Sequence, residues 1–176
     1  MKSDLFNMKA SAPFYLIESY ETCWKCGKRT SVIALAASGV EDDEKRKFNS
    51  FSTLSDVEQI PQRLQTLIDK KYLNYYMDYS KTAESYYFMN HCEHCEAKLG
   101  DFFLHCEPDG AFFPTTEAAA KEKKLIELED AGIIELNASY SMTGPSLIKE
   151  YAVRKKYNPS ADEKTKDVKN TSEDLD

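Results

Sequence analysis

The cysteines of this chain fall into two closely spaced pairs and one single residue. Cys23 and Cys26 form the first Cys-x-x-Cys pair, and Cys92 and Cys95 form the second. Two residues between cysteines let both thiolates reach one ion from a single turn, and zinc prefers four such ligands in a tetrahedron. The sequence therefore predicts one structural Zn²⁺ ion held by four thiolates, with no position left open for water or substrate.

Other polar residues lie close to these pairs in the sequence. His91 and His94 interleave with the second pair. Each is either an alternative ligand that replaces a thiolate, or a residue outside the ligand shell that supports the ligands or lies on the surface. The single thiol, Cys106, is expected to be buried and inert on a strand, with a redox or ligand-exchange role as the alternative. The nearby basic residues either offset the charge of a four-thiolate site or are ordinary solvated side chains: Lys25, Lys28, Arg29 and Lys98.

Two catalytic interpretations of the same residues fit poorly. His91-Cys-Glu93 contains the H-x-E of zinc deaminases, but no Pro-Cys-x-x-Cys follows it. Cys23-Trp-Lys-Cys26 has the spacing of a redox dithiol, yet Gly27 and a β-rich segment follow, where such a pair needs the start of a helix. Phosphate-binding loops, serine-nucleophile elbows and paired-carboxylate motifs are also missing from the sequence. We therefore predict no catalytic residues, and the sequence favours a protein that is not an enzyme.

Short strands are expected to position the cysteines. Aromatic and β-branched residues predict strands over 14–20 and 30–35, so that the first pair lies in a hairpin turn. Tyrosine-rich segments predict two strands between 72 and 89, the second of which leads into the second pair. A further strand over 101–106, a turn at 108–110 and a return strand over 111–113 complete the expected hairpins.

Helices and loops are expected around these hairpins. Pro61 suits the start of a helix that ends near Lys71, and Thr115 or Thr116 can cap a second helix that runs to Ala131 and stops at Gly132. The first dozen residues are expected to be loosely held, and the charged segment 38–53 to be a solvated loop. A short strand is expected over 133–136, and the segment 146–151 is ambiguous between helix and strand.

The first pair and its surroundings resemble the zinc-ribbon class, in which two metal-binding turns face one another. Gly27, directly after the second cysteine of Cys23-Trp-Lys-Cys-Gly-Lys, permits the positive φ that this turn needs. Glu96 stands at the equivalent position of the second turn, so that turn is either strained or shaped differently. Residues 89–95, followed by Gly-Asp-Phe-Phe-Leu-His, also look like uncharacterised bacterial zinc-ribbon proteins, a likeness that implies no activity.

This resemblance, over residues 14–35 and 86–106, implies an α+β fold of short antiparallel hairpins with one or two peripheral helices. We expect a single zinc-ribbon-containing domain over 1–157, with an insertion at about 38–85. From 158 to 176 the composition is polar and charged, which predicts a disordered acidic tail.

Composition limits the function. The chain carries a formal net charge of −7, which disfavours nucleic-acid binding through phosphate contacts. The longest apolar run, 32–37, is too short to cross a membrane, and the N-terminus resembles no signal peptide, so we expect a cytoplasmic protein. The leading hypothesis is a zinc-stabilised protein-binding module, similar to an immunity protein or antitoxin, whose partner is basic. The alternatives are nucleic-acid binding through the basic and aromatic residues beside Trp24, and an enzyme of unrecognised type.

Overall fold

The computed structural model of the chain describes residues 6–128 and 132–158. This part of the protein is mostly β-structure, with 47% of its residues in strands and 17% in helices. Its strands are β1 (Met8–Thr22), β2 (Arg29–Asp42), β3 (Lys47–Phe48), β4 (Ser52–Gln59), β5 (Tyr75–Ser80), β6 (Ser85–His91), β7 (Lys98–Leu99), β8 (Lys124–Glu127), β9 (Ile133–Ser141) and β10 (Val153–Lys156). Its helices are α1 (Gln62–Lys71), α2 (Asp101–His105), α3 (Glu117–Lys121) and α4 (Ser146–Tyr151).

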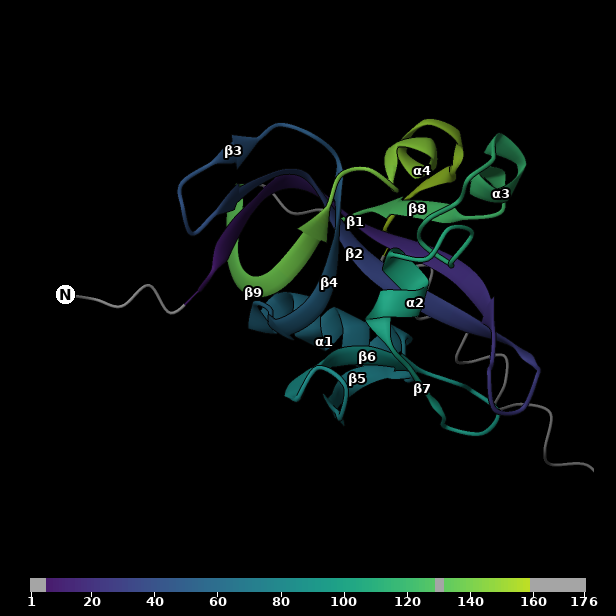
Figure 1. The fold of residues 1–176 in the computed structure, drawn as a ribbon. Helices are drawn as coiled ribbons and strands as arrows, with labels where there is room; N and C mark the ends of the chain where they lie inside the picture. The colour runs from purple at the N-terminus through teal and green to yellow at the C-terminus, as the bar shows by residue number, and fades with distance from the viewer. Residues whose placement is uncertain (1–5, 129–131, 159–176) are drawn as a thin grey trace, which may run out of the picture.

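Four antiparallel strands close into a barrel (Figure 1). β1 pairs with β2, β2 with β4, β4 with β9, and β9 returns to β1. Closure gives each of these strands hydrogen-bonded neighbours on both edges, which removes the exposed edges of an open sheet. Outside the barrel, β8 and β10 extend the sheet from β1, while β5, β6 and β7 form a smaller layer that joins β4 through β6.

The central parts of β1 and β2 are buried on both faces. In β2, Ile33 and Leu35 belong to the core inside the barrel, whereas Val32 and Ala34 belong to a second core outside it. Because side chains alternate across a strand, the unbroken apolar run 32–37 fills both cores at once. The second core is completed by residues from outer segments: Leu104, Phe112, Leu125 and Ile148.

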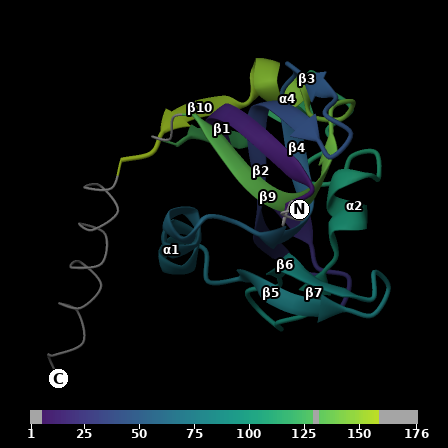
Figure 2. The same ribbon diagram turned by 90° about the vertical axis from the view of Figure 1, so that its left-hand side faces the viewer.

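Helix α1 lies beside the barrel and confirms the helix predicted from Pro61 to Lys71, with Pro61 immediately before its first residue. Its buried residues, Leu64 and Ile68, pack into the core of the barrel. Figure 2 shows α1 and α2 on opposite sides of the strands. The strands predicted between 72 and 89 are also confirmed, as β5 and β6.

The predicted α+β fold of short zinc-ribbon hairpins is wrong, because the closed barrel dominates the structure. β1 and β2 have 15 and 14 residues, about twice the expected length, and β1 begins at Met8 within the segment expected to be loosely held. The segment 38–53 is likewise not a loop, since it contains the end of β2, all of β3 and the start of β4. Part of its charge run is satisfied internally, because Arg46 Nε donates to the buried Asp42 at 2.7 Å.

The segment 101–106, from which the sequence predicts a strand, forms helix α2 instead. A turn docks against this helix: Phe112 donates its N–H to the Leu104 carbonyl at 2.8 Å, and Gly110 approaches the Phe103 carbonyl so closely that a Cβ atom would clash. The predicted return strand over 111–113 belongs to this turn. A helix of five residues is too short to produce a periodic apolar pattern, and tertiary docking determines it instead.

The helix predicted to run to Ala131 is wrong beyond Lys121. Thr116 caps α3 by accepting the Ala119 N–H, but Lys124–Glu127 then pair with β1 as strand β8. The strand predicted over 133–136 is confirmed and extends to Ser141, and the ambiguous segment at 146–151 is helix α4. Residues 129–131 and the tail predicted to be disordered, apart from its first residue, lie outside the described residues.

Candidate metal centre

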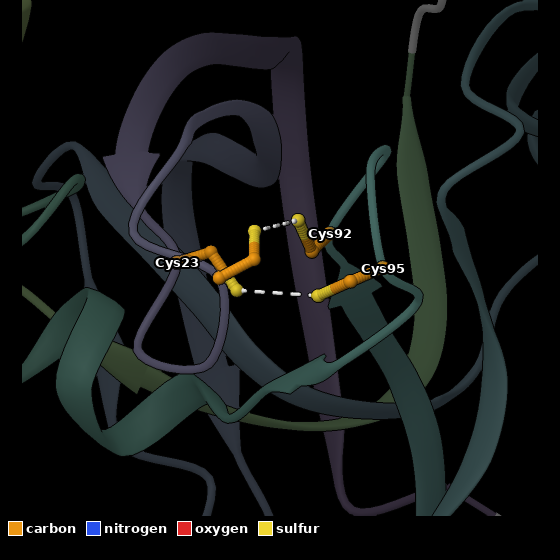
Figure 3. A group of neighbouring side chains, drawn as sticks. Cys23, Cys92 and Cys95 are labelled. Carbon is orange, nitrogen blue, oxygen red and sulfur yellow. Dashed lines mark hydrogen bonds between the residues drawn. The ribbon is translucent and has the colours of Figure 1, made fainter.

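The four paired cysteines meet at the tips of two hairpins. Cys23 and Cys26 lie between β1 and β2, and Cys92 and Cys95 lie between β6 and β7. Their sulfur atoms all lie within 4.8 Å of one another. Cys23 Sγ is 3.6 Å from Cys95 Sγ, and Cys26 Sγ is 3.6 Å from Cys92 Sγ (Figure 3).

These distances fit a metal ion rather than disulfides. A disulfide needs sulfur atoms about 2.05 Å apart, and the four thiols are free. Zinc–sulfur bonds of about 2.3 Å at tetrahedral angles would separate the sulfurs by about 3.8 Å, close to the spacing observed. The cluster can therefore hold one metal ion, and its donors suit Zn²⁺.

The two metal-binding turns have the same backbone shape. In each, the N–H after the second cysteine donates to the carbonyl of the first, from Gly27 to Cys23 at 2.9 Å and from Glu96 to Cys92 at 2.8 Å. Gly27 has a φ of 70° and Glu96 a φ of 58°. Of the two alternatives for the second turn, the structure thus has the strained one, since a residue with a Cβ atom disfavours the left-handed region.

The electrostatics of the site favour a bound cation. Burial opposes ionisation of Cys92, but the N–H groups of His94 and Cys95 and the neighbouring thiols outweigh it and lower the pKa of Cys92 to about 6. At Cys95 the N–H of Ala97 favours the thiolate, yet burial and the other three thiols raise its pKa to about 12. A metal ion among the four sulfurs would stabilise all of them as thiolates, because a coordinating thiol is deprotonated.

Hydrogen bonds hold the two turns together. The Glu93 N–H donates to the hydroxyl of the fully buried Thr30 at 3.0 Å, and His94 Nε2 lies 3.0 Å from the Arg29 carbonyl oxygen. Trp24 Nε1 donates to the Lys98 carbonyl at 2.9 Å. Each contact joins the first hairpin to the second, so these hydrogen bonds help to hold the two cysteine pairs close together.

Neither histidine belongs to the sulfur cluster. His91 is buried and stacked on Tyr76, with ring centroids 3.7 Å apart, and its nitrogens lie within 3.1 Å of the Met89 carbonyl and Asp78. The hydrogen bond from His91, with a second from Lys98, holds the pKa of Asp78 at about 2. His94 instead faces the backbone of the first hairpin. Cys106 lies apart from the cluster, exposed at the end of α2 rather than buried on a strand.

Asn90 positions the second cysteine pair and was not predicted from the sequence. Asn90 is buried in β6, its Oδ1 accepts the Ile33 N–H at 2.8 Å, and its Nδ2 donates to the Ile33 carbonyl at 2.9 Å. The side chain thus acts as a short piece of strand that ties β6 to β2, two residues before Cys92. The available signal was an amide directly after the apolar residues Phe88 and Met89 of this strand.

A buried acid and a buried imidazole were missed as well. Asp101 Oδ2 accepts the Asp56 N–H at 2.8 Å, while its other oxygen has no partner among the described residues. Burial raises the pKa of Asp101 to about 8 and lowers the pKa of His105 to about 3. Both groups are therefore uncharged at pH 7.

An apolar groove adjoins the metal centre. It encloses about 840 Å³ and runs between the first metal-binding turn, the β5–β6 turn and α2. Trp24 is 73% exposed and Phe103 is 68% exposed, although side chains of this size are normally buried. The other apolar residues of the groove are Tyr79, Tyr87, Met89, Leu99 and Leu104.

Comparison with protein-family models, with curated proteins and with solved structures finds no match to this chain. The residues that the structure describes include no helix with the length and apolarity needed to cross a bilayer.

Proposed function

We propose that this chain is a zinc-stabilised, non-enzymatic module that binds another protein through the groove beside its metal centre. The observation that carries the proposal is the exposure of Trp24 and Phe103 on the wall of this groove. Exposed aromatic residues in a groove are typical of recognition sites, because they bury much area at little entropic cost when a partner binds.

The role of zinc in this proposal is structural. Four thiolates complete a tetrahedral shell, whereas catalytic zinc keeps one position for water or substrate. The ion would fix the first metal-binding turn, and with it Trp24, against the second hairpin. Elemental analysis of the purified protein should give one zinc per chain, and Cys23→Ser or Cys92→Ser should lose both the zinc and the native fold around the site.

The partner in this proposal is basic and carries an apolar anchor. Three carboxylates line the groove, from Glu21, Glu107 and Asp109. Of the two lysines there, Lys98 is already bonded to Asp78 at 3.0 Å. Together with the net charge of −7, this arrangement favours a positively charged partner and accelerates its association.

The test compares partner capture by matched surface variants. Wild-type protein, a Trp24→Ala/Phe103→Ser double variant and a Leu73→Ser control are each used to isolate partners from extracts of the source organism. Leu73 is 76% exposed and lies outside the groove, so it controls for the loss of any exposed apolar side chain. A partner retained by wild type and control but lost by the double variant, and rebound after purification, supports the proposal.

The same purified partner gives a quantitative result. Trp24 is the single tryptophan of the chain, so its fluorescence reports directly on the groove. Binding should shift the Trp24 emission of the wild type to shorter wavelength. The double variant has no tryptophan, and calorimetry should show that it binds the partner about 100-fold more weakly, as expected for two aromatic anchors. Equal binding by wild type and double variant would refute the assignment of the groove.

A further inference from the structure

A buried lysine on the far side of the first metal-binding turn lacks the charged partner that such residues usually have. Lys123 is 7% exposed, and its ammonium donates to the Ser19 hydroxyl at 3.2 Å. Within the described residues it forms no ion pair, whereas the adjacent Lys124 reaches Glu18 at 3.2 Å. Buried charges are normally paired, and a lysine ammonium can donate three hydrogen bonds, so Lys123 can bind an acceptor in addition to Ser19.

The backbone holds this side chain in place. The Lys123 N–H donates to the Ala120 carbonyl at 3.1 Å, and its carbonyl accepts the Val153 N–H at 2.9 Å. Lys123 is thus fixed between α3 and β8. Burial lowers the pKa of Lys123, although the carboxylates of Glu122 and Glu21 act in the opposite direction. An ammonium held in this way is costly unless something else compensates for its lost hydration.

Lys123 faces a polar pocket of about 360 Å³ with charges of both signs. The second cation in its wall is Arg29, whose guanidinium stacks over Tyr20 at 4.1 Å and has no carboxylate partner among the described residues. The acidic members of the wall are Glu21, Asp109 and Glu122. A simple anion would be attracted by the two cations but repelled by these carboxylates. A simple cation would be attracted by the carboxylates but repelled by Lys123 and Arg29.

We propose that this pocket binds a small zwitterion of the α-amino acid class. Its carboxylate would accept hydrogen bonds from Lys123 and Arg29, and its ammonium would lie among the acidic residues of the wall. A ligand with both charges satisfies both halves of the lining at once. The volume suits a small polar molecule and is near the lower limit for ligand pockets. This site is separate from protein binding, although Glu21 and Asp109 also line the apolar groove.

The test titrates zinc-loaded protein with glycine, L-serine, L-asparagine and L-aspartate by calorimetry, with ¹⁵N chemical shifts to locate binding. At least one probe should bind saturably and shift the amides of Ala111 and Ala119, which line the pocket. Lys123→Met should weaken that binding by about 10- to 100-fold, because a charged hydrogen bond is lost. Glu122→Gln, an exposed substitution that leaves Lys123 in place, should weaken it about threefold or more through the ammonium.

Two control variants distinguish binding in this pocket from binding elsewhere on the protein. Lys47→Met, which removes an exposed lysine on β3, and the groove variant Trp24→Ala/Phe103→Ser should both bind the amino acid as wild type does. Acetate and methylammonium, which each carry one of the two charges, should bind at least about tenfold more weakly. The proposal is overturned if no probe binds at 20 mM, if Lys123→Met binds as wild type does, or if acetate alone binds as tightly as the amino acid.

Discussion

At the scale of single residues, the two metal-binding turns differ at one strained position. Gly27 and Glu96 occupy equivalent places with φ values of 70° and 58°. No heavy atom lies within 4 Å of a Cβ atom built at Gly27, so a side chain there would add backbone strain without a clash. The second turn is therefore strained where the first is not, so exchanging glycine and glutamate at these two positions tests the effect of that strain.

We expect Glu96→Gly to raise the free energy of unfolding by about 1 kcal/mol, because glycine relieves the left-handed strain. The reverse substitution, Gly27→Glu, should lower it by a similar amount. Urea denaturation of the zinc-bound proteins measures both effects. A loss of stability in Glu96→Gly would show that the glutamate side chain contributes more than the strain removes.

Asp101 makes stability depend on pH. Its pKa is about 8 in the folded protein and near 3.8 when unfolded, so between these values unfolding releases a proton and stability falls as pH rises. Asp101→Asn keeps an acceptor for the Asp56 N–H but cannot ionise. The stability of this variant relative to wild type should thus increase by about 2 kcal/mol from pH 6 to pH 8.

Chemical denaturation of both proteins across that range, with zinc present, isolates this contribution because other titrating groups cancel in the difference. Parallel profiles for wild type and Asp101→Asn would mean that the Asp101 carboxyl is already ionised in the fold. His105 has the opposite pH dependence. Because burial lowers its pKa in the folded protein, the free energy of unfolding should fall as the pH drops below about 6.5.

At the scale of elements, the metal centre depends on how β6 is held beside β2. The Asn90 side chain replaces the strand pairing that these two elements lack at Ile33, with two hydrogen bonds of 2.8 and 2.9 Å. Cys92 follows two residues later, so any displacement of β6 moves the second cysteine pair away from the first.

Asn90→Leu should therefore lower the free energy of unfolding by about 3 kcal/mol, because it leaves the buried Ile33 N–H and carbonyl unpaired. It should also weaken zinc binding about tenfold, as is typical when a group that orients the ligands is lost. Competition with a chromophoric chelator measures the affinity. Ser31→Ala is the control, since the exposed Ser31 contact with Glu93 at 3.3 Å should matter little. Unchanged zinc affinity in Asn90→Leu would contradict this role.

At the scale of the whole molecule, two hydrophobic cores share the β1–β2 hairpin. The barrel core contains no cysteine, whereas Cys23 and Cys92 are part of the outer core. The metal centre thus holds the tips of the hairpins and the outer layer, while the barrel has its own apolar interior and closed hydrogen bonding.

Removing zinc with a chelator should destabilise the hairpin tips and the outer layer while the barrel stays folded. Hydrogen exchange should accelerate in residues 23–29 and 91–99 and in the groove, while the centre of the β1–β2 hairpin stays protected. Hydrogen-exchange mass spectrometry of the zinc-bound and chelated protein measures this directly. Loss of protection throughout the barrel would show instead that the ion maintains the entire fold.

The sequence alone identified the four cysteines that cluster in the structure, because ligand type and spacing are local properties. Two cysteines separated by two residues bring their sulfurs together within one turn, whatever surrounds that turn. Helix α1 and strands β5 and β6 were equally predictable, since proline placement and the tyrosine-rich segments act within a few residues.

The tertiary structure alone decided the barrel, the groove and the polar pocket. The apolar run 32–37 shows that β2 is buried on both faces, but not that one face closes into a barrel with β4 and β9. Helix α2 and strand β8 depend on docking against distant segments, which overrides local propensity in short elements. The environment of Lys123 is assembled from residues about 100 positions apart in the chain, such as Ser19. Which charged side chains share its pocket is a property of the packed fold.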